Sequence, residues 1–118
     1  MKLGEIADQL ALEVQTAKHQ LSTEVTGGYA SDLLSCVMAK AQTGNIWITL
    51  QGHPNVVAVA SLLNLAGVVI TEGMAPDTAT LQKAEEEEIP IMTTPLTAYT
   101  VAGKLYELGV PGVDQESE

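Results

Sequence analysis

The chain has 118 residues and is 46% hydrophobic, which predicts a single domain with enough apolar side chains to form a core. It has 5 basic residues, all of them lysine, against 15 acidic residues, and a formal net charge of -10. Nucleic acids and anionic membrane surfaces are bound through clustered cations, so this charge balance argues against both classes of partner.

Cysteine usage and the start of the chain predict a cytoplasmic protein. A single cysteine, Cys36, cannot form an internal disulfide, which favours a reducing compartment. The N-terminal residues lack the basic start and apolar centre of a signal peptide. No apolar stretch approaches the roughly 18 residues that a membrane-spanning helix needs.

The first third of the chain predicts a helix, a strand and a second helix. Four apolar residues at helical spacing define the first helix: Leu3, Ile6, Ala7 and Leu10. Leu12–Thr16 is typical of a strand, and a short extra strand over Val25–Tyr29 is compatible with the pattern. Ser31 and Asp32 are good N-cap residues for an amphipathic helix over Leu33–Ala41.

A short internal repeat organises the rest of the chain, in segments 45–66, 67–88 and 89–109. Each segment opens with a β-branched run, in turn Ile46–Leu50, Val68–Thr71 and Ile89–Thr93, and continues through a polar turn into a helical pattern. Strands that alternate with helices predict βα units and a parallel sheet. The expected fold is therefore a small three-layer α/β sandwich, with about four parallel strands that include Leu12–Thr16.

The three helices of the repeat differ in expected exposure. Val56–Leu65 is apolar nearly all round, which predicts burial on more than one side. Together with Leu33–Ala41 it carries more apolar surface than one thin sheet can cover, so we expect a homodimer or a higher oligomer. The following helix, Asp77–Glu88, has only a thin apolar stripe and should lie on the surface; that stripe is Ala79, Leu81 and Ala84.

Acidic residues gather in two runs. Glu85–Glu88 is predicted to be a solvated helix face. Residues 114–118 are predicted to form an acidic disordered tail after one domain that spans residues 1–113.

The motifs and their order resemble the DRTGG domain. The resemblance begins in residues 24–35, which contain Thr26-Gly27-Gly28, and continues in Gly44–Thr49 and Gln51–Asn55. It extends through Ile70–Asp77 and through the helix that includes residues 103–106. The Asp-Arg of the family motif is replaced here by Glu24-Val25, so any role of that arginine is absent.

The resemblance implies a fold like the N-terminal domain of HPr kinase/phosphorylase. It also implies a regulatory accessory role, because such domains accompany CBS-domain pyrophosphatases and phosphotransacetylases or stand alone. It transfers no catalytic residue. The sequence contains no Gly-x-x-x-x-Gly-Lys-Ser/Thr phosphate loop, which argues against a kinase, and it predicts neither a cofactor nor a metal site.

We expect a ligand site beyond the carboxyl ends of the strands, where open parallel sheets bind small molecules. The polar residues assigned to this site are Thr16, Thr26, Gly27, Gly28, Gln51, His53, Thr71, Glu72 and Thr94. Helix N-termini nearby would favour a small anionic metabolite or a nucleotide. The negative charge of Glu72 and the lack of arginine favour a ligand with few charges. Polar turns that serve stability alone, or a binding surface for a protein partner, are the alternatives.

The remaining candidates are two histidines, a glycine pair and the cysteine. His53 precedes a helix. It could act as a phosphocarrier or serve a small enzyme, the alternatives to a non-catalytic role, or could hydrogen-bond within its turn. Gly27-Gly28 permits either a phosphate or a close backbone approach. His19 is expected to be solvated, and Cys36 to be an inert thiol on a helix.

Overall fold

The structure, a computed structural model, describes residues 1–114. The predicted tail at 114–118 lies outside the described residues except for Asp114, which is exposed. The helices and strands follow one another as α1 (Leu3–Leu10), β1 (Glu13–Val14), the short 3-10 helix η1 (Lys18–Gln20), β2 (Gly27–Ala30), α2 (Leu34–Lys40), β3 (Asn45–Thr49), α3 (Asn55–Leu63), β4 (Gly67–Ile70), α4 (Thr78–Glu86), β5 (Ile91–Thr93) and α5 (Ala98–Glu107).

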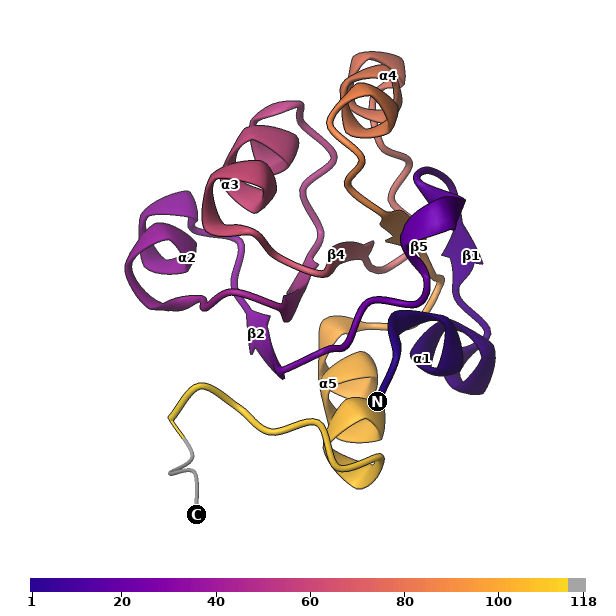
Figure 1. Cartoon of the computed structure of the whole chain (residues 1–118), viewed down its shortest axis with the longest axis vertical. Helices are drawn as coiled ribbons and strands as arrows, with labels where there is room; N and C mark the ends of the chain where they lie inside the picture. The colour runs from indigo at the N-terminus through magenta and orange to yellow at the C-terminus, as the bar shows by residue number, and fades with distance from the viewer. Residues whose placement is uncertain (115–118) are drawn as a thin grey trace.

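A five-stranded sheet with the order β1-β5-β4-β3-β2 forms the middle layer. Strands β2 to β5 are parallel and lie side by side in their sequence order. Right-handed crossovers that always step in the same direction place their helices on one face of a sheet. Helices α2, α3 and α4 accordingly cover one face, and α1 and α5 cover the other (Figure 1). The predicted three-layer α/β sandwich is thus confirmed.

The identity of the four parallel strands differs from the prediction. The segment Leu12–Thr16 forms only the two-residue strand β1, which pairs antiparallel with β5 at the edge of the sheet. The fourth parallel strand is β2, close to the extra strand predicted over Val25–Tyr29. The chain reverses at Ala11, in the left-handed conformation, directly after α1. After this reversal β1 runs opposite to β5.

The hydrophobic core has two parts, one on each side of the sheet. Leu3 and Ile6 of α1 and Val101 of α5 pack on the side chains of Ile48 and Met92. On the other side, the helices α2, α3 and α4 pack on side chains that include Trp47 and Ile91. The indole of Trp47 is fully buried, and its Nε1 donates a hydrogen bond of 2.8 Å to the Ser31 carbonyl.

The helices cover the sheet almost as predicted. In α3, Val56, Val57, Val59 and Ala60 are buried. In α4, Thr80 rather than Ala79 is buried, because the Thr80 hydroxyl donates a hydrogen bond of 2.6 Å to the Gly52 carbonyl. The apolar stripe predicted for this helix is thus partly wrong.

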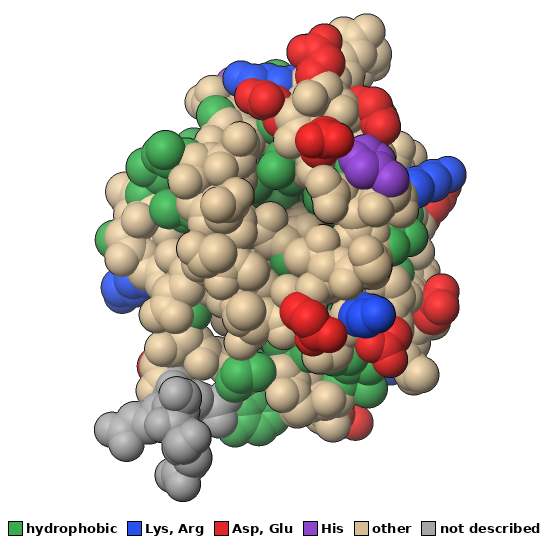
Figure 2. Space-filling model, viewed as in Figure 1, with side chains coloured by type: hydrophobic (Ala, Val, Ile, Leu, Met, Phe, Trp, Pro, Cys, Tyr) green, Lys and Arg blue, Asp and Glu red, His purple; other side chains and the backbone are tan. Residues whose placement is uncertain are grey.

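The acidic run Glu85–Glu88 is exposed at the end of α4, where acidic side chains gather in Figure 2. Two of its carboxylates contact the segment after β1: Glu85 accepts a hydrogen bond from the Ala17 amide, and Glu88 lies 3.0 Å from the exposed His19 ring. Across residues 1–114, no helix combines the length and the apolar character needed to cross a membrane.

Candidate functional site

Polar residues line the carboxyl edge of the parallel strands, where the sequence predicts a site. The hydroxyls of Thr49, Thr71 and Thr94 belong to buried side chains, and each has a hydrogen-bond partner. Thr49 donates to an Asp32 carboxylate oxygen at 2.8 Å, Thr71 donates to the Thr49 carbonyl at 3.5 Å, and Thr94 accepts from the Leu96 amide at 3.1 Å. These threonines hold the connections that follow the strands.

Asp32 organises the end of β3, a role that the sequence pattern did not indicate. One of its carboxylate oxygens accepts from the Thr49 hydroxyl and, at 2.9 Å, from the Leu50 amide. The side chain of Gln51 donates to the Asp32 carbonyl. The N-cap function predicted for Ser31 and Asp32 is wrong, because α2 begins after Leu33 and has no side-chain cap. The Asp32 carboxylate bonds to β3 and to the residue that follows it, and the Ser31 hydroxyl accepts from the Leu33 amide.

His53 is exposed in the connection between β3 and α3. Its Nδ1 accepts a hydrogen bond of 3.1 Å from the Asn55 amide, at the start of α3. An acceptor at that nitrogen corresponds to an imidazole with its proton on Nε2. The histidine therefore serves the helix start, as its structural interpretation requires; a phosphocarrier role stays untested.

Glu72 and Gly73 turn the connection between β4 and α4 over the end of β5. Both residues adopt the left-handed conformation, with φ of 61° and 69°. The Glu72 amide donates to the Leu96 carbonyl at 2.8 Å, and the Gly73 amide donates to the Thr94 carbonyl at 3.0 Å. A left-handed glutamate is unfavourable by itself, and these two hydrogen bonds help to offset that cost.

Four of the predicted site residues lie at the opposite, amino edge of the sheet. Thr16 follows the antiparallel β1, and its hydroxyl donates to the Ile89 carbonyl at 2.7 Å. Thr26, Gly27 and Gly28 lie at the start of β2, where Gly27 pairs with Asn45, the first residue of β3. The prediction that these residues join the carboxyl-edge site is therefore wrong, because the direction of β1 and the start of β2 place them at the other end of the strands.

The pair Gly27-Gly28 serves a close backbone approach. The C-terminal segment runs beside β2, and the Gly28 amide donates to the Pro111 carbonyl at 2.8 Å. A Cβ atom on Gly27 would lie 2.9 Å from that carbonyl oxygen. Of the two interpretations of the pair, the structure shows the close approach, made by the chain to itself.

A cavity of about 490 Å³ opens where the carboxyl end of β5 meets the edge strand β1. The lining residues come from three separate segments and are Ala11, Glu13, Gln15, Gly73, Met74, Ala75, Pro76, Leu81, Thr93, Thr94 and Pro95. Cavities of roughly 300–1,000 Å³ are the usual size of small-molecule sites. This cavity is the candidate functional site.

The floor of the cavity is polar because of the strand register. Ile91 and Met92 pack on opposite faces of the sheet, so Thr93 shares the α4 face with Ile91. Glu13 lies directly opposite Thr93 in the antiparallel pair, and Gln15 shares the face of Glu13. The Gln15 side-chain amide donates to the Thr93 hydroxyl at 3.0 Å.

Thr94 is the one predicted site residue that lines this cavity. Gln51 and His53 belong to the connection after β3, and Glu72 directly precedes the lining loop that begins at Gly73. Glu13, Gln15 and Thr93 were not assigned to the site. Polar residues at 13 and 15 alternate with apolar ones at 12 and 14, which indicates one polar face, but only the pairing with β5 shows where that face lies. Within residues 1–114, no group of three or more His, Cys, Asp or Glu residues could hold a metal ion.

Comparisons with known proteins agree with the sequence resemblance. The family model of the DRTGG domain matches residues 5–108. A crystal structure of the CBS and DRTGG domains from the regulatory region of a Clostridium perfringens pyrophosphatase, complexed with its activator diadenosine tetraphosphate, superimposes with a TM-score of 0.71 at 19% identity. The alignment covers 99% of this chain and 50% of that one, so this chain spans about half the length of that regulatory region. No match was found among curated proteins.

Proposed function

The chain belongs to the DRTGG domain family, and from that premise we propose that it is a non-catalytic regulatory domain that binds a small metabolite at the carboxyl edge of its sheet. The cavity between β1, β5 and the loop before α4 is the observation that carries the proposal. The structural neighbour supports a ligand-binding regulatory role, since that regulatory region is complexed with a nucleotide activator. We therefore place nucleotides first among the candidate ligands.

The position of the cavity provides a means of regulation. Its walls come from residues 11–15, 73–76 and 93–95, which are far apart in the sequence, and from Leu81 of α4. A ligand that contacts all of them would stabilise their relative positions. Binding and the ordering of such segments are coupled in free energy, so a bound ligand would change what this edge of the domain presents to a protein partner. We propose the cytoplasm as the location of this activity, because one cysteine cannot form the internal disulfide typical of oxidising compartments.

The test is a thermal-shift screen of nucleotides and phosphorylated metabolites against the wild-type chain and two variants. A ligand at a hundredfold excess over its Kd should stabilise the fold by about 2.7 kcal/mol, which is roughly 10 °C in Tm for a domain of this size. Ala75→Trp should fill the cavity and abolish the shift, whereas His53→Ala, outside the cavity, should preserve it. A shift that survives Ala75→Trp would contradict this location, and a complete absence of shifts would contradict the ligand-binding function.

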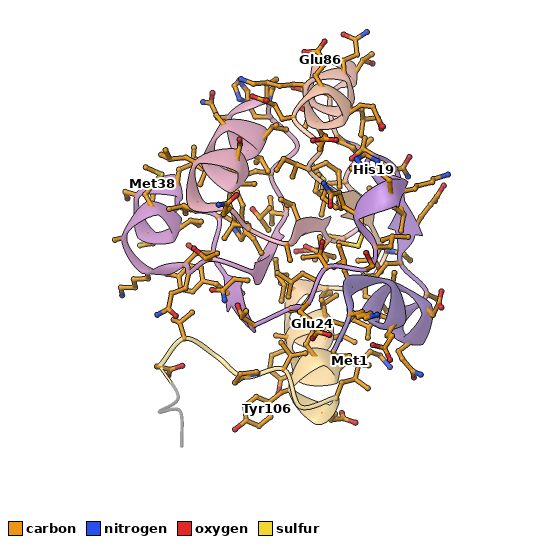
Figure 3. The ribbon with its side chains drawn as sticks, in the orientation of Figure 1. Met1, His19, Glu24, Met38, Glu86 and Tyr106 are labelled. Carbon is orange, nitrogen blue, oxygen red and sulfur yellow. The ribbon has the colours of Figure 1, made fainter. Side chains whose placement is uncertain are left out.

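The proposal includes a homodimer formed through the layer of α2 and α3. Leu62 is 69% exposed, Leu33 is 61% exposed and Met38 is 43% exposed, and all three belong to these helices or their caps. Hydrophobic side chains gather on this side of the molecule in Figure 2, and Met38 points outward from α2 in Figure 3. Light scattering at micromolar concentration should give twice the 12.4 kDa chain mass. Leu62→Glu should reduce it to the monomer value, and a monomeric wild-type chain would refute the dimer.

A further inference from the structure

Building on the proposed function, we infer that the cavity recognises an amino-substituted nucleobase, which enters with its N–H donors toward the sheet and leaves any phosphate outside. The inference comes from the pattern of donors and acceptors on the floor, the apolar walls and the charge of the lining residues. Each of these excludes a different alternative.

The floor of the cavity offers more acceptors than donors. The Gln15 side chain donates one amide N–H to the Thr93 hydroxyl at 3.0 Å, and this hydrogen bond orients the rest of the side chain. The Gln15 carbonyl oxygen and the Glu13 carboxylate are then acceptors, while Thr93, which accepts from Gln15, keeps one proton to donate. An amino group beside a ring nitrogen, as in adenine, matches this set, because it supplies N–H donors and one acceptor.

The walls of the cavity fit a flat and partly apolar body. Met74, Ala75 and Pro76 form one side as a continuous loop, and Leu81 of α4 contributes the adjoining surface. Methionine is a flexible and polarisable side chain that packs well against aromatic rings. A small polar metabolite without a ring would leave these apolar side chains uncovered.

The charge of the lining excludes a phosphate as the inserted group. Glu13 carries the only charge among the lining residues given above, and no lysine is one of them. Phosphate groups are commonly bound by arginine, lysine, a bound cation or the amides of a helix N-terminus, and the lining offers none of the cationic side chains. A polyphosphate that entered first would meet the Glu13 carboxylate without a compensating cationic side chain, which favours entry of the base.

The experiment compares three probes by isothermal titration calorimetry: adenosine, inosine and ATP. Inosine has a carbonyl in place of the amino group of adenosine, so it should bind about tenfold more weakly, or not measurably. ATP should bind no more tightly than adenosine. Glu13→Gln should weaken adenosine binding about tenfold, and Glu107→Gln on α5 serves as the matched control because Glu107 lies outside the cavity.

The outcomes separate this inference from the proposed function. Preference for adenosine over inosine, lost in Glu13→Gln but retained in Glu107→Gln, would support the inference. ATP that binds more tightly than adenosine, and still more tightly to Glu13→Gln, would overturn it, because a phosphate would then occupy the cavity while the domain remained a ligand sensor. Equal binding of adenosine and inosine would also overturn it. If none of the three probes binds but another metabolite from the thermal-shift screen binds in the cavity, the inference is refuted. The proposed function would then still hold.

Discussion

Two glycine-to-alanine substitutions should change stability in opposite directions. Gly27 begins β2 beside the C-terminal segment, and a Cβ atom there would lie 2.9 Å from the Pro111 carbonyl oxygen and 3.2 Å from the Asn45 side-chain nitrogen. Gly103 lies within α5, where a Cβ atom would meet nothing within 4 Å. The chemical change is the same at both positions, so any difference in sign must come from the surroundings.

The magnitudes follow from these contacts. Overpacking against backbone costs about 1–3 kcal/mol, and the reduced freedom of the unfolded chain returns about 0.4–1 kcal/mol. Gly27→Ala should therefore destabilise the fold by about 1–2 kcal/mol, because the Pro111 segment must move and its 2.8 Å hydrogen bond from the Gly28 amide is lengthened. Gly103→Ala should stabilise the fold by about 0.5–1 kcal/mol, the usual advantage of alanine within a helix.

Urea denaturation measures both effects in one assay. With an m-value of about 2 kcal/mol/M, the two midpoints should differ by about 1 M, with the wild-type midpoint between them. The m-value should stay unchanged, since neither substitution alters the surface exposed on unfolding. A Gly27→Ala variant as stable as the wild-type chain would refute the close approach, and it would reopen the ligand-binding interpretation of Gly27-Gly28.

Three further experiments test the roles of Thr16, Asp32 and His53. Thr16→Val should destabilise the fold by about 2–3 kcal/mol in urea denaturation, because its buried hydroxyl satisfies both the Ile89 carbonyl and the Ile91 amide. The control Thr43→Val, at an exposed position, should change the stability by no more than about 0.5 kcal/mol. Equal effects of the two substitutions would contradict the hydrogen-bonding role of Thr16. Asp32→Ala should lower the stability of the fold by about 1–3 kcal/mol. Asp32→Asn should lower it less, because asparagine keeps an oxygen acceptor for the Thr49 hydroxyl and the Leu50 amide. The reverse order would mean that the charge of Asp32, rather than its hydrogen bonds, stabilises the end of β3. Incubation with a phosphodonor should leave the wild-type chain without label on histidine, and a label that His53→Ala abolishes would establish the phosphocarrier alternative.

The elements of this protein were largely predictable because their signals are local. The β-branched runs at 46–50 and 68–71 became β3 and β4, and the helical patterns that follow them became α3 and α4. Alternation and helical spacing depend on neighbouring residues alone, so a sequence displays them directly. The continuous apolar runs of the strands also predicted helices on both faces of the sheet, because a strand that is apolar on both faces must be covered on both. The predicted family followed from motifs spread along the whole chain.

The direction of β1 and the position of the site were decided by the tertiary structure. The segment Leu12–Thr16 has the pattern of a strand whichever way it pairs, and two pairs of residues with β5 settle its direction. That direction moves Thr16 to the amino edge and brings Glu13 and Gln15 to the carboxyl end of β5. The partner of Gly27 is likewise a segment more than eighty residues away in the chain. Pairing between distant segments depends on the free energy of the whole fold, which no local pattern records, and so the cavity could be located only once the strands were placed.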